Sequence, residues 1–407
     1  MKQRLSRSEI LFLAAYGLWL IFAVLSLTYF KDFIPLSDIR KAVEKIVVLL
    51  LACKLLEDNE LDTGTLLGLA VMGLAWVICQ KADITDLYLY AWFIFSMRNL
   101  DYRRVFRFTI LLQLVLMGLT VGCTLMGLLP NELWRASMVQ ELAGDVSQSS
   151  EYRDRYSWGY TYCTYGSHIA LFLTLTYMSL KKTLKLWQAL MLLAFNLLWL
   201  KGTNTYTDLF LFLFSIIGLY VVSRLQLGFS SRKIARILYA LAGPAMAVIS
   251  IGAQYLYDGR EPLWRRANSF FNGRLKLGNE GIREYGIPLL GQKLKWVGAR
   301  GAKLHPDWVY NYVDSSYLKY AIHYGILFEI VLLVGLFALG WKVAEEKNPG
   351  LQMAFLTWVI YGMIDAELLV LAMQPIMLLL GLVLAGGGAK RGTVPGSYSL
   401  SGAKASA

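Results

Sequence analysis

The chain has 407 residues, of which 57% are hydrophobic and 17% charged, and its 40 Lys and Arg residues against 28 Asp and Glu residues give a net charge of +12. Soluble domains are about 45–50% apolar and about 25% charged, so this composition, with a mean hydropathy of +0.48, excludes a disordered chain and disfavours a soluble globule. The Lys and Arg residues lie between apolar runs, where positive charge orients membrane helices and contacts lipid headgroups. We therefore expect a polytopic membrane protein with membrane lipid and no nucleic acid among its partners.

Apolar runs of about 20 residues, the length that crosses a bilayer core of about 30 Å as a helix, recur along the chain. The basic segment 1–9 leads into the first run, which is too long for the apolar core of a signal peptide, so we expect it to remain as a membrane helix. The pattern predicts an all-α fold with about twelve transmembrane helices, at residues 10–30, 39–56, 64–80, 84–98, 108–128, 158–180, 185–200, 206–223, 236–254, 317–341, 351–365 and 368–386.

The basic loops set the expected orientation. Lys and Arg residues gather at 98–107, 181–185 and 224–236, so these loops and the N-terminus are expected in the cytoplasm. The chain then divides into helices one to nine (1–254) with an outer loop at 130–157, a large basic extracytoplasmic loop (255–316), helices ten to twelve (317–386), and a flexible cytoplasmic tail (387–407) rich in Gly, Ser and Ala.

The loop 255–316 carries ten Lys and Arg residues against six acidic ones, a balance of +4. On the outer side this opposes the usual charge bias. Long loops are exempt from that bias, so one interpretation is a solvated loop with spare charge. The other is an anion-binding surface, because the planar arginine fork meets phosphate oxygens in two parallel hydrogen bonds.

Three motifs follow one another here: Asn268-Ser-Phe-Phe-Asn-Gly-Arg274, Tyr285-Gly-Ile-Pro-Leu-Leu-Gly291, and Val313-Asp314-Ser-Ser-Tyr317-Leu318, which opens a predicted helix that soon reaches Gly325. Their order and spacing resemble those of the Wzy-type O-antigen and capsule polysaccharide polymerases, relatives of the O-antigen ligases. The segment Arg153-Asp-Arg155-Tyr-Ser-Trp-Gly159 also resembles the family's R-x-S-x-G-F motif, although Tyr162-Cys163-Thr164 follows where the family has His-Pro-Asn.

The resemblance implies a GT-C-like glycosyltransferase in the bacterial cytoplasmic (inner) membrane, with its active site facing the periplasm or exterior. Donor and acceptor would be oligosaccharides linked to polyprenyl diphosphate, a chain-length regulator is a further expected partner, and no cofactor is expected. The reaction expels a diphosphate, whose growing negative charge must be stabilised. The sequence has no Asp-x-Asp motif for a metal, and its four cysteines have no ligand-like spacing, so arginines are expected to do this.

Arg274 and Arg155 are the arginines that we expect at the diphosphate. Arg153 is an alternative to Arg155, which with Asp154 would otherwise form a weak surface pair. Arg265 and Arg266 are further candidates for substrate binding in the same loop.

Asp314 is the candidate base for the acceptor hydroxyl, because burial would raise the pKa of an otherwise weak base. It is equally well explained as a helix N-cap. His305 and His323 are rival bases, and Tyr317 belongs with them to the expected substrate site. His168 lies within an apolar run, which favours a packed, hydrogen-bonded histidine.

Four acidic residues fall within or at the ends of predicted membrane helices: Asp208, Glu329, Asp365 and Glu367. A charge at the bilayer centre costs about 2.5–3.5 kcal/mol, so each should lie near an interface or face the bundle interior. Three lie near predicted outer ends, and Glu329 should have an interior partner or a water-lined cavity. A polymerase is the preferred interpretation. A ligase that transfers glycan to a lipid or protein acceptor and a membrane transporter are the alternatives.

Overall fold

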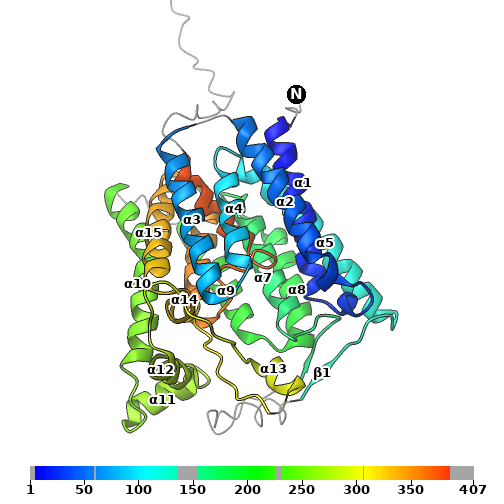
Figure 1. Cartoon of the computed structure of the whole chain (residues 1–407). Coiled ribbons are helices and arrows are strands. Elements are labelled where there is room, and N and C mark those ends of the chain that lie inside the picture. Colours follow the sequence, from blue (N-terminus) through cyan, green and yellow to red (C-terminus); the bar gives the residue numbers. More distant parts are fainter. Residues whose placement is uncertain (1–4, 59–60, 136–153, 225–231, 306, 386–407) are drawn as a thin grey trace, which may run out of the picture.

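The computed structural model describes residues 5–58, 61–135, 154–224, 232–305 and 307–385 (Figure 1). Helices make up 74% of the structure, whereas the sheet consists of β1 (Leu133–Trp134) paired antiparallel with β2 (Arg155–Tyr156), which confirms the all-α class. Among the described residues, six helices are long and apolar enough to cross a membrane, at residues 7–26, 63–82, 102–125, 206–223, 233–255 and 326–345. The predicted tail and Arg153 fall outside the described residues.

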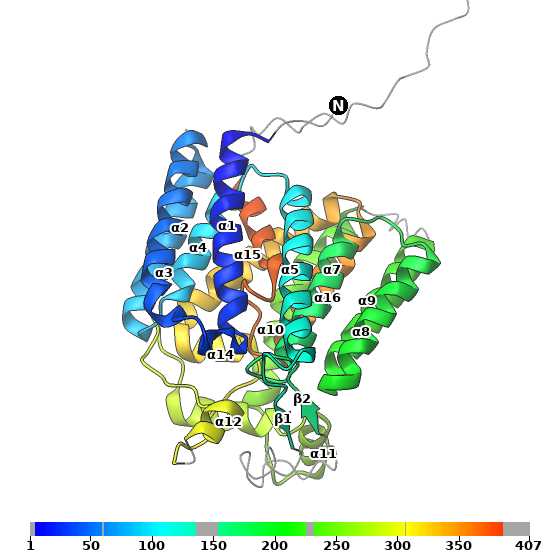
Figure 2. The same cartoon turned by 90° about the vertical axis from the view of Figure 1, so that its right-hand side faces the viewer.

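The first five helices form one side of the bundle (Figure 2). They are α1 (Arg7–Ser26), α2 (Leu36–Asp58), α3 (Thr63–Ala82), α4 (Asp86–Met97) and α5 (Tyr102–Leu125), with the short 3-10 helix η1 (Tyr29–Asp32) after α1. Side chains cap three of them: the Ser6 hydroxyl accepts from Glu9 N, Asp62 from Thr65 N, and Asp101 from Arg103 N. Such caps satisfy backbone donors that a helix start leaves unpaired. They explain why α5 begins at residue 102 rather than at the predicted 108.

The other side of the bundle contains α7 (Tyr165–Ser179), α8 (Leu186–Thr203), α9 (Tyr206–Arg224), α10 (Arg232–Tyr255), α15 (Ile326–Glu345) and α16 (Pro349–Ile364). Helix α10 packs along α15, and α16 contacts α7, α9 and α10. The helix predicted to begin at residue 158 begins at 165 instead, because Trp158 and Gly159 both have positive φ and form a turn.

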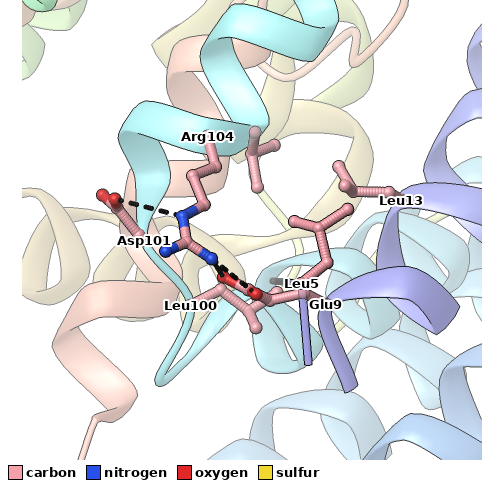
Figure 3. Close-up of a pocket in the computed structure, with 7 residues that line it drawn as sticks. Leu5, Glu9, Leu13, Leu100, Asp101 and Arg104 are labelled. Carbon is pink, nitrogen blue, oxygen red and sulfur yellow. Dashed lines mark hydrogen bonds and ion pairs between the residues drawn. The ribbon is translucent and has the colours of Figure 1, made fainter. Parts of the chain in front are cut away.

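Ion pairs gather the predicted basic loops at one end of the bundle. Arg104 binds Glu9 at 2.7 Å beside a small pocket between the starts of α1 and α5 (Figure 3). Arg103 binds Glu346, and Arg236 binds Glu345, each at 3.3 Å. The starts of α1, α5 and α10 and the end of α15 therefore share the end that carries the N-terminus, as the parity of the helices requires.

The segment between α10 and α14 lies at the opposite end of the bundle (Figures 1 and 2). It contains three short helices, α11 (Pro262–Phe270), α12 (Arg274–Tyr285) and α13 (Ala299–Leu304), and it leads into α14 (Ser316–Tyr324). The strands β1 and β2 lie at the same end. We call this end, with α11 to α14 and the two strands, the outer end, after the orientation that the basic loops predict.

The helix predicted at 317–341 is divided, which corrects the sequence interpretation. Gly325 has φ +91°, and a Cβ placed there would lie 2.6 Å from Gly291 N. The segment 286–292 crosses the break: Ile326 N donates to Pro288 O, and Gln292 N donates to His323 O. Backbone groups freed by the break are thus paired by protein rather than exposed to lipid.

The last predicted helix, 368–386, is also wrong. Residues 365–374 are irregular, and a 3-10 helix, η3 (Pro375–Leu384), follows. Side chains take over the hydrogen bonds of the irregular segment. Ser316 Oγ donates to Asp365 O, Leu369 N donates to Tyr320 Oη, and Gln113 Nε2 donates to Ala372 O. These polar partners come from other helices, which explains why an apolar stretch leaves the α conformation here.

Candidate functional site

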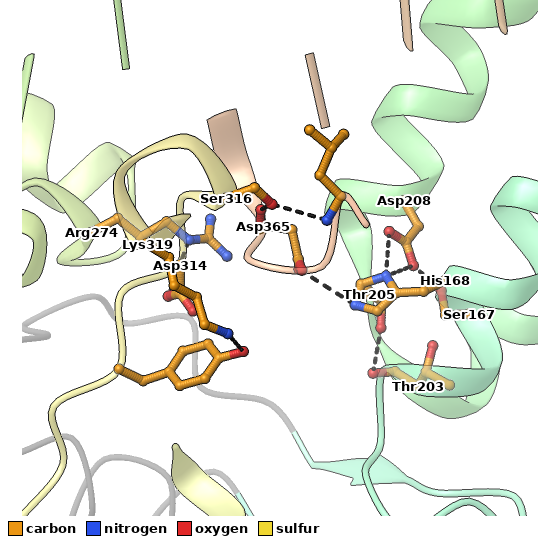
Figure 4. Close-up of polar contacts among 12 residues, drawn as sticks. Ser167, His168, Thr203, Thr205, Asp208, Arg274, Asp314, Ser316, Lys319 and Asp365 are labelled. Carbon is orange, nitrogen blue, oxygen red and sulfur yellow. Dashed lines mark hydrogen bonds and ion pairs between the residues drawn. The ribbon is translucent and has the colours of Figure 1, made fainter. Parts of the chain in front are cut away.

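Arg274 and Asp314, both predicted site residues, form an ion pair at the outer end (Figure 4). Arg274 Nε lies 3.3 Å from Asp314 Oδ2. Arg274 begins α12 directly after Gly273, whose φ of +83° is favourable for glycine. The buried Asn268 accepts a hydrogen bond from Lys276 N at 2.9 Å, which fixes the turn between α11 and α12. The segment from Asn268 to Arg274 therefore forms a fixed turn that places the Arg274 side chain beside Asp314.

The N-cap alternative for Asp314 is wrong, because Ser315 occupies that position and its hydroxyl faces Leu318 N at 3.5 Å. Burial raises the pKa of the Asp314 carboxyl, and the Arg274 guanidinium opposes that shift. The carboxylate is therefore both a better base than a solvated aspartate and an anchor for a guanidinium.

Arg155 lies in β2, at the same end of the bundle as the Arg274–Asp314 pair. It interacts with Cys163, and the ring of Tyr162 interacts electrostatically with both Arg155 and Asp314. The outer rim holds further cations. Lys303 of α13 forms an ion pair with Glu132, which also interacts with Arg300. The structure thus places Arg155, from the predicted outer loop 130–157, and Arg274, from the loop 255–316, at the same end of the bundle.

A buried histidine network adjoins this pair (Figure 4). His168 Nδ1 lies 3.0 Å from Asp208 of α9, which also accepts a hydrogen bond from Ser167. His168 Nε2 lies 3.5 Å from Asp365 Oδ2 in the irregular segment after α16. His168 is packed and hydrogen-bonded, as the sequence predicts, but its partners are carboxylates rather than neutral core groups.

Lys319 of α14 joins the two groups of charges. Its ammonium donates to Tyr312 Oη at 2.8 Å and interacts electrostatically with Glu367, Asp365 and Asp314. Burial and the Asp365 carboxylate raise the pKa of Glu367 to about 7, and Glu367 Oε2 has no hydrogen-bond partner among the described residues. Asp314, Asp365 and Glu367 therefore form one acidic group around a lysine.

Ligand atoms of His168, Asp365 and Glu367 lie within 4.8 Å of one another, the closest approach to a metal-binding geometry that we find in the described chain. The Lys319 ammonium interacts with the same two carboxylates and would compete with a cation for them. We assign no metal to these residues.

The remaining predicted residues lie apart from this group. Arg265 and Arg266 are exposed on α11, and His305 is exposed and stacked on Trp308 at 3.8 Å between ring centroids. Tyr317 is fully buried, and its hydroxyl donates to Val359 O, which favours a packing role over the expected substrate contact.

His323 was expected near the outer surface, but it is 5% exposed and accepts a hydrogen bond from Trp296 Nε1 at 3.1 Å. Burial lowers the pKa of His323 to about 4, so the ring is neutral at pH 7. Glu329, for which we expected an interior partner, is 1% exposed, and neither of its carboxylate oxygens has a hydrogen-bond partner among the described residues.

Lys319 is the residue of this group that the sequence interpretation missed. Two features of the sequence could have indicated it. Lys319 lies about one helical turn after Ser315, in the helix that follows Asp314. In addition, each of the three acidic residues near predicted outer ends needed a neutralising partner. Comparisons with protein-family models, with curated proteins and with solved structures give no match to this chain.

Proposed function

We propose that this chain polymerises oligosaccharide repeat units linked to polyprenyl diphosphate into O-antigen or capsular polysaccharide. The reaction would take place on the outer face of the bacterial cytoplasmic membrane. The observation that supports this most strongly is the Arg274–Asp314 pair at 3.3 Å, because the two residues come from separate motifs that resemble the polymerase family. The proposal includes about twelve membrane helices, of which the described residues contain six that are long and apolar enough to cross a membrane.

The charge distribution suits glycosyl transfer from a diphosphate. Arg274, Arg155 and Arg300 lie toward the rim, where they would bind the leaving diphosphate and stabilise its growing charge without a metal. The carboxylates of Asp314, Asp365 and Glu367 lie in the same region, beside Lys319 and His168. A donor diphosphate at the rim would therefore place its sugar toward groups that can accept a proton from an acceptor hydroxyl.

A ligase would use the same donor and leaving group. The residue at position 314 favours the polymerase, because ligases of the related family carry a histidine in this motif and this chain carries Asp314.

A transporter is the second candidate, and one observation favours it. Helix breaks at Gly325 and at residues 365–374 lie beside buried charges, an arrangement that transporters use at substrate sites. The sugar-polymerising proposal is preferred because the cations Arg155 and Arg274 come from outer segments rather than from within membrane helices.

The test is a reconstituted reaction. Purified protein in liposomes receives a single lipid-linked repeat unit and no other protein, and the products are separated by length. A ladder of lengthened lipid-linked glycans supports the polymerase. Transfer only to an added lipid A core or protein acceptor supports the ligase. Movement of the lipid-linked unit between leaflets without lengthening supports the transporter and refutes the proposal.

A further inference from the structure

Helix α11 carries an apolar face that no described part of the chain covers. Leu263 and Phe270 are seven positions apart, so they lie on the same side of the helix, and they are 76% and 81% exposed. Asn268, on the other side, is buried and accepts a hydrogen bond from Lys276 N of α12. Helix α11 is thus amphipathic, and its apolar side points away from α12.

A ring contact places α11 at the level where α10 ends. Helix α10, one of the long apolar helices, ends at Tyr255. The ring of Tyr257, two residues later, packs edge-on against Trp264 of α11, with 6.3 Å between the ring centroids. Tyrosine and tryptophan are enriched where membrane helices meet water. Helix α11 therefore begins at the depth of the membrane–water interface.

Helix α12 holds α11 at this depth. Asn279 Nδ2 of α12 donates to Gln254 O at 2.9 Å and to Tyr255 O at 3.1 Å, in the last turn of α10. A Cβ at Gly278 would lie 1.8 Å from Gln254 Oε1, so α12 packs directly against that turn. Because the hydrogen bond of Asn268 fixes the turn between α11 and α12, the position of α11 relative to α10 is fixed as well.

Two features make lipid the partner that fits this face. The exposed apolar surface of α10 continues along the chain through Tyr255 and Leu256 to α11. In addition, residues 262–279 carry four Lys and Arg residues and no acidic residue, and two of these cations, Arg265 and Arg266, are exposed on α11. Arginine matches the oxygens of a phosphate group. A helix with arginine on its polar side and leucine and phenylalanine on the other is typical of helices that lie in the headgroup layer.

We propose that α11 is an interfacial helix that binds the adjoining leaflet of the membrane. Leu263 and Phe270 insert among the acyl chains, and Arg265 and Arg266 bind lipid phosphates. This contact does not depend on the proposed reaction. It has a consequence for that reaction, because the fixed turn after α11 leads directly to Arg274. The membrane surface would then hold Arg274 at the level of lipid phosphates, where the diphosphate of a polyprenyl-linked donor also lies.

The experiment measures the depth of nitroxide labels on single cysteines in a cysteine-free chain, in liposomes of phosphatidylethanolamine and phosphatidylglycerol. The variants are Leu263→Cys, Phe270→Cys and, as the control on the polar side of the same helix, Ser269→Cys, which is also an exposed position. Collisions with O₂, which concentrates among the acyl chains, are compared with collisions with a water-soluble nickel chelate. The apolar face of an interfacial helix lies about 5–10 Å into the boundary between headgroups and acyl chains, so the labels at 263 and 270 should report this depth and the label at 269 a shallower one.

Two outcomes of this measurement overturn the proposal. Labels at 263 and 270 that meet the chelate as often as the label at 269 would show that the face is in water. Labels at 263 and 270 that are shielded from both reagents would show that protein, such as a second copy of this chain, covers the face.

The phosphate contact is tested by charge reversal. Arg265→Glu combined with Arg266→Glu should move the label at 270 out of the membrane and into contact with the chelate, because glutamate is repelled by lipid phosphates. The matched control Arg283→Glu, at an exposed position on α12, should leave the depth of that label unchanged. An unchanged depth in the double variant, with thermal unfolding like that of the parent chain, would refute the phosphate contact.

Discussion

The substitution Arg274→Lys tests whether an arginine stabilises the diphosphate leaving group in the proposed reaction. In the structure, the contact with Asp314 uses Arg274 Nε, which leaves the two terminal nitrogens of the guanidinium to face a diphosphate in parallel. A lysine has one nitrogen for both tasks. It can keep the ion pair with Asp314 or contact the diphosphate, but it cannot meet two phosphate oxygens while holding the carboxylate.

The expected magnitude follows from that geometry. A transition-state contact of this kind is worth about 2.7–4 kcal/mol, or 10²–10³ in rate. The ion pair itself is partly exposed, at 24% and 28% for its two side chains, and contributes under about 1 kcal/mol. Arg274→Lys should therefore lower the rate of lengthening by about 10²–10³-fold while the free energy of unfolding changes by less than about 1 kcal/mol.

The assay measures initial rates of glycan lengthening by wild type, Arg274→Lys and the control Arg283→Lys at saturating donor. Arg283 lies on the same helix α12 but is exposed. A loss below about fivefold for Arg274→Lys, the scale of an exposed pair, would assign Arg274 to the solvated surface. The diphosphate site would then move to Arg155 or another outer cation.

Three further predictions follow from the topology, the leaving-group chemistry and the break at Gly325. In a cysteine-free background, a cysteine at Lys293, whose side chain is 72% exposed, should react with an impermeant reagent in intact cells, whereas one at Lys182 should react only after lysis; the reverse pattern would invert the membrane orientation. Treatment with EDTA should leave the rate of lengthening unchanged, and a loss that Mg²⁺ or Mn²⁺ restores would refute the arginine account and direct attention to His168, Asp365 and Glu367. Gly325→Ala should lower the free energy of unfolding by at least about 1–3 kcal/mol, because φ is +91° and Gly291 N lies 2.6 Å from the added Cβ; unchanged thermal unfolding would mean that the break is not strained.

The sequence predicted the features that depend on local pattern. Apolar runs located most helices, and the parity of the basic loops placed Glu9, Arg104 and Glu345 at one end. The motif comparison selected Arg274 and Asp314, which form a pair although they lie 40 positions apart.

What the sequence could not predict depends on distant partners. The stretch after Asp365 is apolar enough for a helix, and hydrogen bonds from other parts of the chain, including those of Ser316, Tyr320 and Gln113, hold it in another conformation. The glycine at position 325 is visible in the sequence. The reason that a glycine is needed there is the close approach of the Gly291 backbone, which belongs to a separate segment. Likewise, Asp208 and Asp365 become candidate site residues only because both contact His168 in the folded chain.

The crossing of segment 286–292 through the break at Gly325 restricts how the outer end can open. Main-chain hydrogen bonds join Ile326 to Pro288 and Gln292 to His323, so backbone pairing attaches this part of the long outer segment to α14 and α15. It cannot swing away as a hinged lid without breaking backbone pairs that lipid would not replace. In the proposed reaction, a bulky glycan would therefore enter past elements that side chains attach, such as α13, whose Lys303 forms an ion pair with Glu132 beside β1.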